Sequence, residues 1–168
     1  KDSYILCHID GRAFSKMIKK RFKLPFDDEF MQMMDDTAAY VCENVQGAKL
    51  AYVQSDEISI VITSFKYENG ELIQGSSFFD YRLCKLQSII ASLATAKFNQ
   101  LFTLWMINKD PDKSISQQIN EIPLIQFDCK CWDVNTYDDM FAWFKFRQND
   151  CIRNSMQQFS QAYCSHKE

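Results

Sequence analysis

The sequence predicts an α+β domain, an antiparallel sheet with helices on one face in the ferredoxin-like split βαβ arrangement. Strand-like and helical segments follow one another in the order β-α-β-β-α-β-α, which is the order of elements in this arrangement. The 168 residues, 46% of them hydrophobic, can build one core. Because only 4 Gly and 3 Pro are present, flexible linkers are not expected, and residues 1–168 should form a single domain.

The first 26 residues predict a strand followed by a short helix. Residues 3–10 are apolar and β-branched, as in a strand, and they end at Asp10. Gly11 permits a tight turn or a close approach of the backbone to a ligand. The helix that follows should end before Pro25, because proline disfavours the helical conformation of the residue that precedes it.

A longer helix and two strands come next. The helix should begin at Asp27 or Asp28, since either can cap it, and Gly47 should end it. Its buried face recurs at helical spacing and comprises Phe30, Met34, Thr37, Ala38, Val41 and Val45. Residues 49–54 and 57–65 predict two strands with a tight junction between them.

The second half of the chain predicts two long helical segments around one strand. Asn69–Gly70 marks a turn, and a helix should then span about 79–105. A polar loop around 108–111 separates this helix from a strand over 124–132. The final stretch, from about 136 to 163, should form one long helix or two.

Composition limits the class of protein. The formal net charge of −3 argues against a protein that coats nucleic acid nonspecifically, although it permits a local basic patch. No apolar run approaches the ~18 residues of a membrane span, so no membrane partner is expected. No cysteine pair has C-x-x-C spacing, which predicts reduced, partly buried thiols in a reducing compartment, cytoplasmic or mitochondrial. The seven cysteines are Cys7, Cys42, Cys84, Cys129, Cys131, Cys151 and Cys164.

Three acidic residues stand at the ends of predicted strands. Asp10 ends the first strand, and Asp56 and Glu57 lie at the junction of the second and third. The first and third strands are neighbours in a ferredoxin-like sheet, so these carboxylates should converge at one edge. Magnesium prefers oxygen ligands and is usually held by one or two carboxylates together with substrate phosphates. The pattern therefore predicts a metal site for phosphoryl transfer.

Five blocks of this sequence are informative together: HIDGRAF at 8–14, QSDEISIVI at 54–62, ASLATAKFN at 91–99, FRQNDCIRNS at 146–155 and SHKE at 165–168. In this order they resemble the tRNA-histidine guanylyltransferase superfamily. Enzymes of this superfamily add nucleotides to the 5′ end of tRNA in the 3′-to-5′ direction. Their catalytic domain is similar to the palm of ordinary polymerases, and it carries extensions on both sides. The resemblance thus implies a polymerase palm without those extensions.

The resemblance also implies a set of site residues. Asp10 and Asp56 match the two aspartates that bind two Mg²⁺ ions, and Gly11 matches a glycine whose carbonyl reaches a metal. Glu57 matches an acidic residue that is needed for activity. The segments that contact the nucleotide correspond to Asp10, Gly11, Arg12, Ala13, Phe14, Ser15, Ser55 and Asp56.

Further cations match phosphate contacts of the family. Arg82 and Lys85 match residues that bind the triphosphate, and their spacing would place them on one face of a helix. The candidates for contacts with the tRNA end are Arg147, Gln148, Asp150, Arg153 and Asn154. A basic run in the first helix is better explained as a solvated surface than as a tRNA contact; it comprises Lys16, Lys19, Lys20, Arg21 and Lys23.

One departure from the family pattern bears on the reaction. Guanylyltransferases proper carry the signature His-Ile-Asn-Asn in the late helix, and here the matching positions are Ile152–Arg153–Asn154–Ser155. This form resembles the guanylyltransferase-like branch, which repairs 5′-truncated tRNA by copying the opposite strand. We therefore expect template-dependent addition after activation of the 5′ end by ATP or GTP, with G addition to tRNA-histidine as the alternative. The implied partners are tRNA, ATP, GTP and other NTPs, and the implied assembly is a homo-tetramer, a dimer of dimers.

Two other classes share the predicted topology. A nucleotide cyclase would have the same sheet and metals, but the block at 146–155 favours a tRNA enzyme. A non-catalytic RNA-recognition domain would stack bases on aromatic side chains of its sheet. The central strand instead presents Ile58, Ile60 and Ile62 on one face, which is typical of a packed core.

Overall fold

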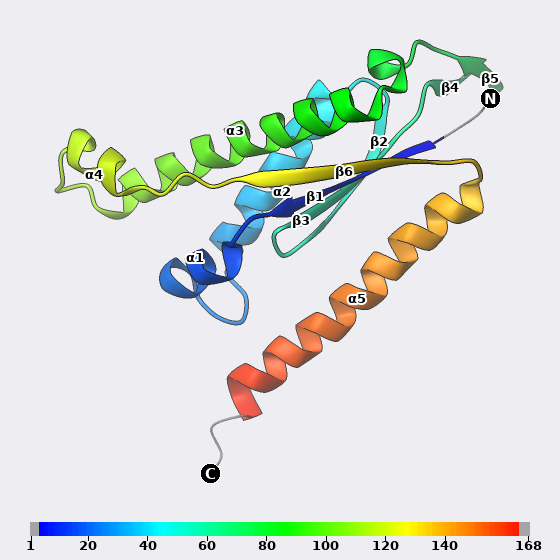
Figure 1. Cartoon of the computed structure of the whole chain (residues 1–168). Coiled ribbons are helices and arrows are strands. Elements are labelled where there is room, and N and C mark those ends of the chain that lie inside the picture. Colours follow the sequence, from blue (N-terminus) through cyan, green and yellow to red (C-terminus); the bar gives the residue numbers. More distant parts are fainter. Residues whose placement is uncertain (1–3, 165–168) are drawn as a thin grey trace.

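The computed structural model describes residues 4–164, and these form a four-stranded sheet, a separate hairpin and a set of helices (Figure 1). The expected order of the main elements is confirmed. The elements are β1 (Tyr4–Gly11), α1 (Phe14–Arg21), α2 (Asp28–Asn44), β2 (Ala48–Gln54), β3 (Glu57–Ile62), β4 (Phe65–Glu68), β5 (Glu71–Gln74), the 3-10 helix η1 (Phe78–Tyr81), α3 (Leu83–Lys109), α4 (Ile115–Glu121), β6 (Phe127–Val134) and α5 (Tyr137–Cys164).

The main sheet has the strand order β2-β3-β1-β6, and every neighbouring pair in it is antiparallel. This is the split βαβ topology, because β1 lies between β3 and the last strand. The predicted α+β class is therefore confirmed. The register places Asp10 opposite Glu57 on one side and opposite Asp128 on the other.

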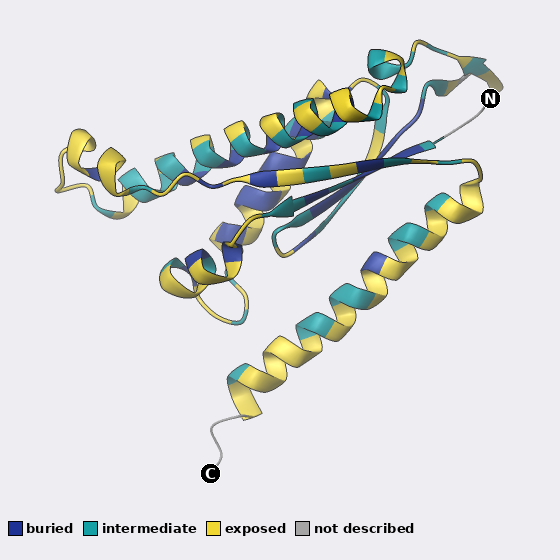
Figure 2. Cartoon of the chain, viewed as in Figure 1, coloured by how far each residue is buried: buried dark blue, intermediate teal, exposed yellow. Residues whose placement is uncertain are grey.

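Alternation along β1 directs one set of side chains into the core. Ile5, Cys7 and Ile9 are buried against α2 and α3, whereas the alternate residues His8 and Asp10 lie on the other face. Figure 2 shows buried residues along β1 and along α2. Helix α2 begins where predicted, since Asp27 Oδ1 accepts a hydrogen bond of 3.0 Å from the backbone N–H of Phe30. Helix α3 contributes a buried stripe at four-residue spacing: Leu86, Ile90, Ala94, Phe98 and Phe102.

Helix α5 crosses the second face of the sheet. The sequence predicted helices on one face only, so this arrangement was not expected. Trp143 of α5 lies edge-on to the ring of His8, with 5.6 Å between the ring centroids. It also contacts Trp132 of β6, at 4.8 Å. Only the first half of α5 contacts the sheet in this way, and the second half extends away from it (Figure 1). The predicted stretch 136–163 is thus one continuous helix.

Several boundaries differ from the sequence prediction. The long helix begins at Leu83 instead of about 79, because Phe79, Asp80 and Tyr81 adopt left-handed backbone conformations. The predicted strand 57–65 is divided into β3 and the first strand of the β4–β5 hairpin, which turns at Asn69–Gly70. Two further differences are the short helix α4, which was not predicted, and a last strand that starts at Phe127 and not at residue 124. Residues 165–168, which carry the block SHKE, lie outside the described residues.

A membrane-spanning helix is absent from the described part of the chain: none of its helices is long and apolar enough to cross a bilayer.

Candidate active site

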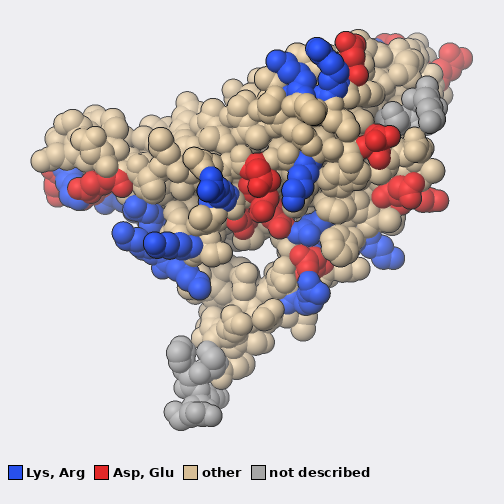
Figure 3. Space-filling view, in the orientation of Figure 1, with Lys and Arg blue, Asp and Glu red and all other residues tan. Residues whose placement is uncertain are grey.

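A row of polar side chains crosses the sheet at one end, on the face that α5 covers. Register pairing aligns Gln54 of β2 with Glu57 of β3, Glu57 with Asp10 of β1, and Asp10 with Asp128 of β6. Directly opposed residues of antiparallel strands point to the same face with Cβ atoms about 5 Å apart. The structure therefore brings Asp10 and Glu57 together as the strand order predicts. Figure 3 shows acidic side chains gathered in the middle of this view, with basic side chains on both sides.

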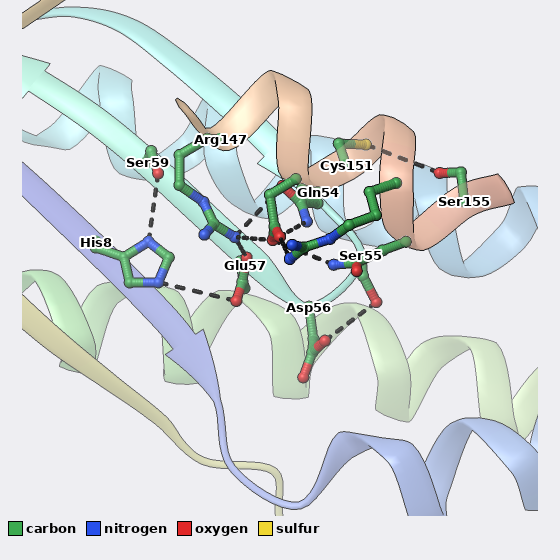
Figure 4. Close-up of polar contacts among 12 residues, drawn as sticks. His8, Gln54, Ser55, Asp56, Glu57, Ser59, Arg147, Cys151 and Ser155 are labelled. Carbon is green, nitrogen blue, oxygen red and sulfur yellow. Dashed lines mark hydrogen bonds and ion pairs between the residues drawn. The ribbon is translucent and has the colours of Figure 1, made fainter. Parts of the chain in front are cut away.

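Asp56 joins this row through the turn between β2 and β3. The turn is tight because Ser55 adopts a left-handed conformation, with φ of 52°. The backbone N–H of Gly11 donates a hydrogen bond of 3.1 Å to the carbonyl of Asp56, so the end of β1 is fixed against the turn. The Asp56 carboxylate accepts a hydrogen bond of 3.1 Å from the Ser55 hydroxyl (Figure 4). Asp10, Gly11, Ser55, Asp56 and Glu57 thus belong to one small region.

Burial and mutual repulsion disfavour negative charge at this site. Burial raises the pKa of Asp56, and the negative charge of Asp10 raises it further. Burial also raises the pKa of Glu57, with added contributions from Asp10 and Asp56, although Arg147 acts in the opposite direction. A bound cation would relieve this repulsion, because it favours the charged form of each carboxylate.

The donor set fits a magnesium ion that shares its ligands with a substrate. Within residues 4–164, no group of three or more His, Cys, Asp or Glu side chains is arranged to hold a metal by itself. Two aspartates with a neighbouring backbone carbonyl are nevertheless the usual protein contribution to a Mg²⁺ site, since substrate phosphates and water complete the octahedron. Glu57 is already engaged by Arg147, whereas neither Asp10 nor Asp56 forms an ion pair within residues 4–164.

Arg147 of α5 links the late helix to the sheet through a buried network (Figure 4). Its guanidinium forms an ion pair with Glu57 and donates a hydrogen bond of 3.4 Å to Gln54. It also lies 3.5 Å from Asp150, which in turn accepts a hydrogen bond of 3.3 Å from Gln54. Hydrogen bonding from Gln54 and the charge of Arg147 lower the pKa of Asp150. Because Arg147 is only 8% exposed, its guanidinium is committed to this network and is not free for the tRNA contact expected from the sequence.

The other late-helix candidates surround this network. Asn154 donates a hydrogen bond of 3.1 Å to Asp150, and Arg153 forms an ion pair with the same carboxylate. The side chain of Arg153 is 76% exposed, and Gln148 is exposed as well, so both can reach a partner. The block at 146–155 is therefore divided between residues that hold α5 on the sheet and residues that face outward.

The β1–α1 turn presents backbone rather than side chains. Phe14 is 1% exposed and packs against Phe30, Phe98 and Phe127, so its ring belongs to the core. A Cβ atom on Gly11 would lie 2.4 Å from the Phe14 ring, which explains why glycine occupies that position.

The remaining residues of this predicted segment are exposed. Ala13 adopts a left-handed conformation at the N-terminus of α1, and Ser15 follows in the first turn of the helix. Arg12 is anchored to Gln126 through its backbone N–H, at 2.9 Å, and through its side chain, at 3.2 Å. The exposed start of α1 thus lies beside the carboxylates.

Arg82 and Lys85 are not brought to this site. Thr95 in the middle of α3 accepts a hydrogen bond of 3.1 Å from the backbone N–H of Phe127, the register partner of Gly11. Arg82 precedes Thr95 by thirteen residues, which is about 20 Å along the helix axis. Arg82 is the N-cap residue of α3 and not part of the helix, but its side chain and that of Lys85 both contact Phe79, so the two cations lie on one side as expected. Both cations are exposed. The start of α3 lies at the opposite end of the sheet from α1 (Figure 1).

The site also contains residues that the sequence did not indicate. Asp128 adds a further exposed carboxylate beside Asp10, and Gln54 connects the turn to α5. Asp128 is one of several polar residues in β6, so the sequence did not single it out, and its place beside Asp10 follows only from the pairing of β6 with β1. His8 is half-buried between Ser59 and Trp143, and burial lowers its pKa.

Comparison with known proteins supports a family assignment. The family model described as tRNAHis guanylyltransferase matches residues 1–135. A solved bacterial tRNA(His) guanylyltransferase (Thg1)-like protein in complex with ATP is 36% identical, with a TM-score of 0.76 over 95% of this chain and 62% of that one. The same kind of bacterial protein in complex with GTP is 35% identical, with a TM-score of 0.77 over 95% of this chain and 67% of that one.

Curated sequences agree with the structural match. The tRNA(His) guanylyltransferase of Schizosaccharomyces pombe is 32% identical over 98 residues, which are 58% of this chain and 34% of that protein. An uncharacterized protein, R259, of Acanthamoeba polyphaga mimivirus is 28% identical over 165 residues, which are 94% of this chain and 55% of that protein. The chain thus spans between about a third and just over half of these curated relatives.

Proposed function

Because this chain belongs to the tRNAHis guanylyltransferase family, we propose that it is a nucleotidyltransferase that adds nucleotides to the 5′ end of tRNA with two Mg²⁺ ions. The observation that carries the proposal is the convergence of Asp10 and Asp56 at one end of the sheet, fixed by the hydrogen bond from Gly11 to the Asp56 carbonyl. Its relatives with bound ATP and GTP support a nucleotide substrate.

The proposed metal ions would be held by Asp10, Asp56 and the Gly11 carbonyl. Ions bound there supply activation of an attacking hydroxyl and stabilisation of the leaving oxygen in phosphoryl transfer. The two aspartates lie on β1 and on a tight turn, so the fold holds them in place before substrate arrives. The nucleotide would lie over the exposed start of α1, with Arg12, Ser15 and Ser55 near its phosphates.

Arg147 would act as a positioning residue in this scheme. Its ion pair holds Glu57 against α5, which keeps the Glu57 carboxylate oriented beside the aspartates without making it a third metal ligand. The exposed Gln148 and Arg153, with Asn154 beside them, remain the proposed contacts to the tRNA end. Arg82 and Lys85 would contact phosphate at a second position, because about 20 Å of α3 separates them from the nucleotide held by the same chain.

Template-dependent repair is the form of the reaction that we propose, with ATP or GTP activating the 5′ end. It rests on Ile152–Arg153–Asn154–Ser155 in the late helix, where guanylyltransferases proper have His-Ile-Asn-Asn. In the structure Ile152 and Arg153 are exposed on α5, whereas Asn154, beside Asp150, and Ser155 are half-buried. Base pairing with the template strand, and not a protein side chain, would then select the nucleotide.

The test is an assay with labelled 5′-truncated tRNAs and tRNA-histidine, supplied with Mg²⁺ and all four NTPs. We expect addition of the nucleotide complementary to the template strand, and a loss of about a thousand-fold or more in Asp10→Ala and Asp56→Ala. Asp133→Ala is the matched control, because Asp133 is an exposed aspartate at the opposite end of the sheet, opposite Ile5. Template-independent G addition to tRNA-histidine would support the alternative, and full activity of Asp10→Ala would refute the metal site.

A further inference from the structure

Three cysteine sulfur atoms lie in contact beneath the sheet. Cys7 of β1 and Cys131 of β6 are direct register partners, and their Sγ atoms are 3.1 Å apart. The Sγ atom of Cys129, two residues earlier on the same face of β6, is 3.6 Å from that of Cys131. Cys131 is thus the central sulfur of the trio, and the remaining four cysteines form no such group: Cys42, Cys84, Cys151 and Cys164.

The cysteine trio is nearest to solvent at the edge of the sheet. Cys7 is fully buried, and Cys131 is 7% exposed. Cys129 is half-buried on β6, which is the edge strand of the sheet. A small molecule can therefore approach Cys131 past Cys129 from the edge, whereas Cys7 has no exposed surface.

Hydrogen bonding within the trio favours the thiolate form of Cys131 over the thiolate forms of its two neighbours. Hydrogen bonding with Cys129 and with Cys7 lowers the pKa of the Cys131 thiol, while the pKa values of the other two thiols are raised. Thiolate is the nucleophilic form of cysteine, so Cys131 is the reactive member of the group.

We propose that Cys131 is a site of oxidation by hydroperoxides and that Cys7 resolves it, giving a cross-strand disulfide between β1 and β6. The geometry carries this assignment, because directly opposed residues of antiparallel strands have the Cα and Cβ separations that a disulfide requires. Cys129 serves as a hydrogen-bonding neighbour at the open edge of the trio.

The chemistry balances in two steps. The Cys131 thiolate attacks one oxygen of hydrogen peroxide, the O–O bond breaks, and the products are Cys131 sulfenic acid and hydroxide. The Cys7 sulfur then attacks the sulfenic sulfur, the S–O bond breaks, and the S–S bond forms. Hydroxide leaves in this second step and takes the proton of the Cys7 thiol as water. Two electrons pass from the two sulfurs to the peroxide, and a thiol reductant reverses the process.

The modification would lie close to the candidate active site without changing it directly. Cys7 is three residues before Asp10 on β1, and its side chain points to the α3 face, whereas Asp10 points to the α5 face. The disulfide would therefore join β1 to the edge strand beneath the carboxylates. This inference does not depend on the proposed nucleotidyltransferase activity.

The experiment is peptide mapping of the reduced chain after graded exposure to hydrogen peroxide. Free thiols are blocked by alkylation, and the protein is digested without reduction and analysed by mass spectrometry. We expect a cross-linked pair of peptides containing Cys7 and Cys131, lighter than the sum of the two by two hydrogen atoms. It should appear at a peroxide dose that leaves the exposed Cys84 and Cys164 reduced, so that both are still alkylated afterwards. Oxidation of Cys84 or Cys164 at lower dose than Cys131 would overturn the proposal.

Variants identify the order of the two steps. In Cys7→Ala the sulfenic acid has lost its partner, and a dimedone adduct at Cys131 should increase several-fold over the unsubstituted chain. Cys131→Ser should abolish both the cross-link and any adduct at Cys7, whereas Cys84→Ser, the control, should leave the cross-link unchanged. A dimedone adduct confined to Cys129 in Cys7→Ala would show that the edge thiol is the reactive one and would refute the assignment. The mapping of the unsubstituted chain decides the main question even if a variant does not fold.

Discussion

Arg147 is the residue on which the junction between α5 and the sheet depends. It is buried, and its guanidinium contacts Glu57, Gln54 and Asp150 at once. Removing one partner of a buried ion pair leaves the other charge without compensation, and the loss exceeds the value of the pair itself.

Arg147→Met should therefore lower the free energy of unfolding by about 2–3 kcal/mol, measured by urea denaturation. Arg147→Lys keeps the charge but not the planar fork of donors, so it should lose only part of this free energy. The double variant Arg147→Met with Glu57→Gln should recover stability relative to Arg147→Met alone. If the double variant were less stable than either single one, the ion pair would not be the reason.

Asp56 illustrates the cost of gathering carboxylates. Its pKa in the folded protein is raised above the ordinary value of 3.8, chiefly by burial. The folded state therefore binds more protons than the unfolded state just above pH 3.8, so stability falls as pH rises through the folded pKa. At neutral pH the full cost of burying the Asp56 charge is subtracted from the free energy of unfolding.

Asp56→Asn should accordingly raise the free energy of unfolding at pH 7 while abolishing nucleotide addition. The gain should disappear below the ordinary aspartate pKa of 3.8, where Asp56 is protonated in both states. Urea denaturation at the two pH values measures this difference, and the exposed Asp133→Asn is the control. Equal stability of Asp56→Asn and the unsubstituted chain at pH 7 would contradict this account of the site.

Among the elements, the connection between α2 and β2 has a backbone conformation that is constrained at Gly47. The residue has φ of +85°, and a Cβ atom there would lie 2.4 Å from the carbonyl oxygen of Thr63. That backbone cannot move away freely, because the N–H of Thr63 donates a hydrogen bond of 2.9 Å to the Gly47 carbonyl.

Gly47→Ala should destabilise the chain by about 2 kcal/mol or more, since strain at a left-handed position and a clash with backbone add together. Gly70→Ala is the matched control: φ is +83° there as well, but nothing lies within 4 Å of the added Cβ. Its cost should be about 1 kcal/mol. Thermal or urea unfolding of both variants separates the clash from the backbone strain, and similar losses would show that the clash is relieved.

The elements show how far local pattern predicts this fold. The apolar run of β1 and the helical spacing in α2 are strong signals because these apolar residues form the core, so both elements were placed within a few residues. The start of α3 was misplaced because Phe78 and Phe79 continue an apolar pattern, while the backbone there is left-handed. A sequence pattern does not report backbone conformation at non-glycine residues.

The candidate site likewise contains some features that the sequence could predict and others that it could not. Asp10, Asp56 and Glu57 could be predicted to converge, because topology and strand ends decide their positions. The role of Arg147 could not, since it depends on which face α5 packs against and on the rotation of that helix. The separation of Arg82 from the carboxylates also depends on tertiary structure, namely the direction in which α3 crosses the sheet.

At the scale of the whole molecule, ligand binding should be coupled to stability. A ligand that binds only the folded state stabilises it by about 2.7 kcal/mol at a concentration of one hundred times its Kd. For a chain of this size that free energy corresponds to an increase in the unfolding midpoint of about 5–10 °C.

We expect this increase when saturating Mg²⁺ and GTP are added together to the unsubstituted chain, measured by thermal unfolding. GTP without Mg²⁺ should give a smaller shift, because the two aspartates repel the phosphates when no cation lies between them. Asp10→Ala should show little response to Mg²⁺ and GTP together, whereas Asp133→Ala should respond as the unsubstituted chain does. A full response in Asp10→Ala would place the metal ions elsewhere.

The central position of β1 has a consequence for how this sequence can change over evolution. Successive residues of the strand serve opposite purposes: Ile9 fills the core, and Asp10 is part of the polar row. Inserting or deleting one residue here would exchange the two faces of the strand, so the core and the polar row would be disrupted together. Insertions and deletions should accordingly be selected against in residues 5–10. They should be tolerated at the Asn69–Gly70 hairpin tip, where neither the core nor the polar row depends on register.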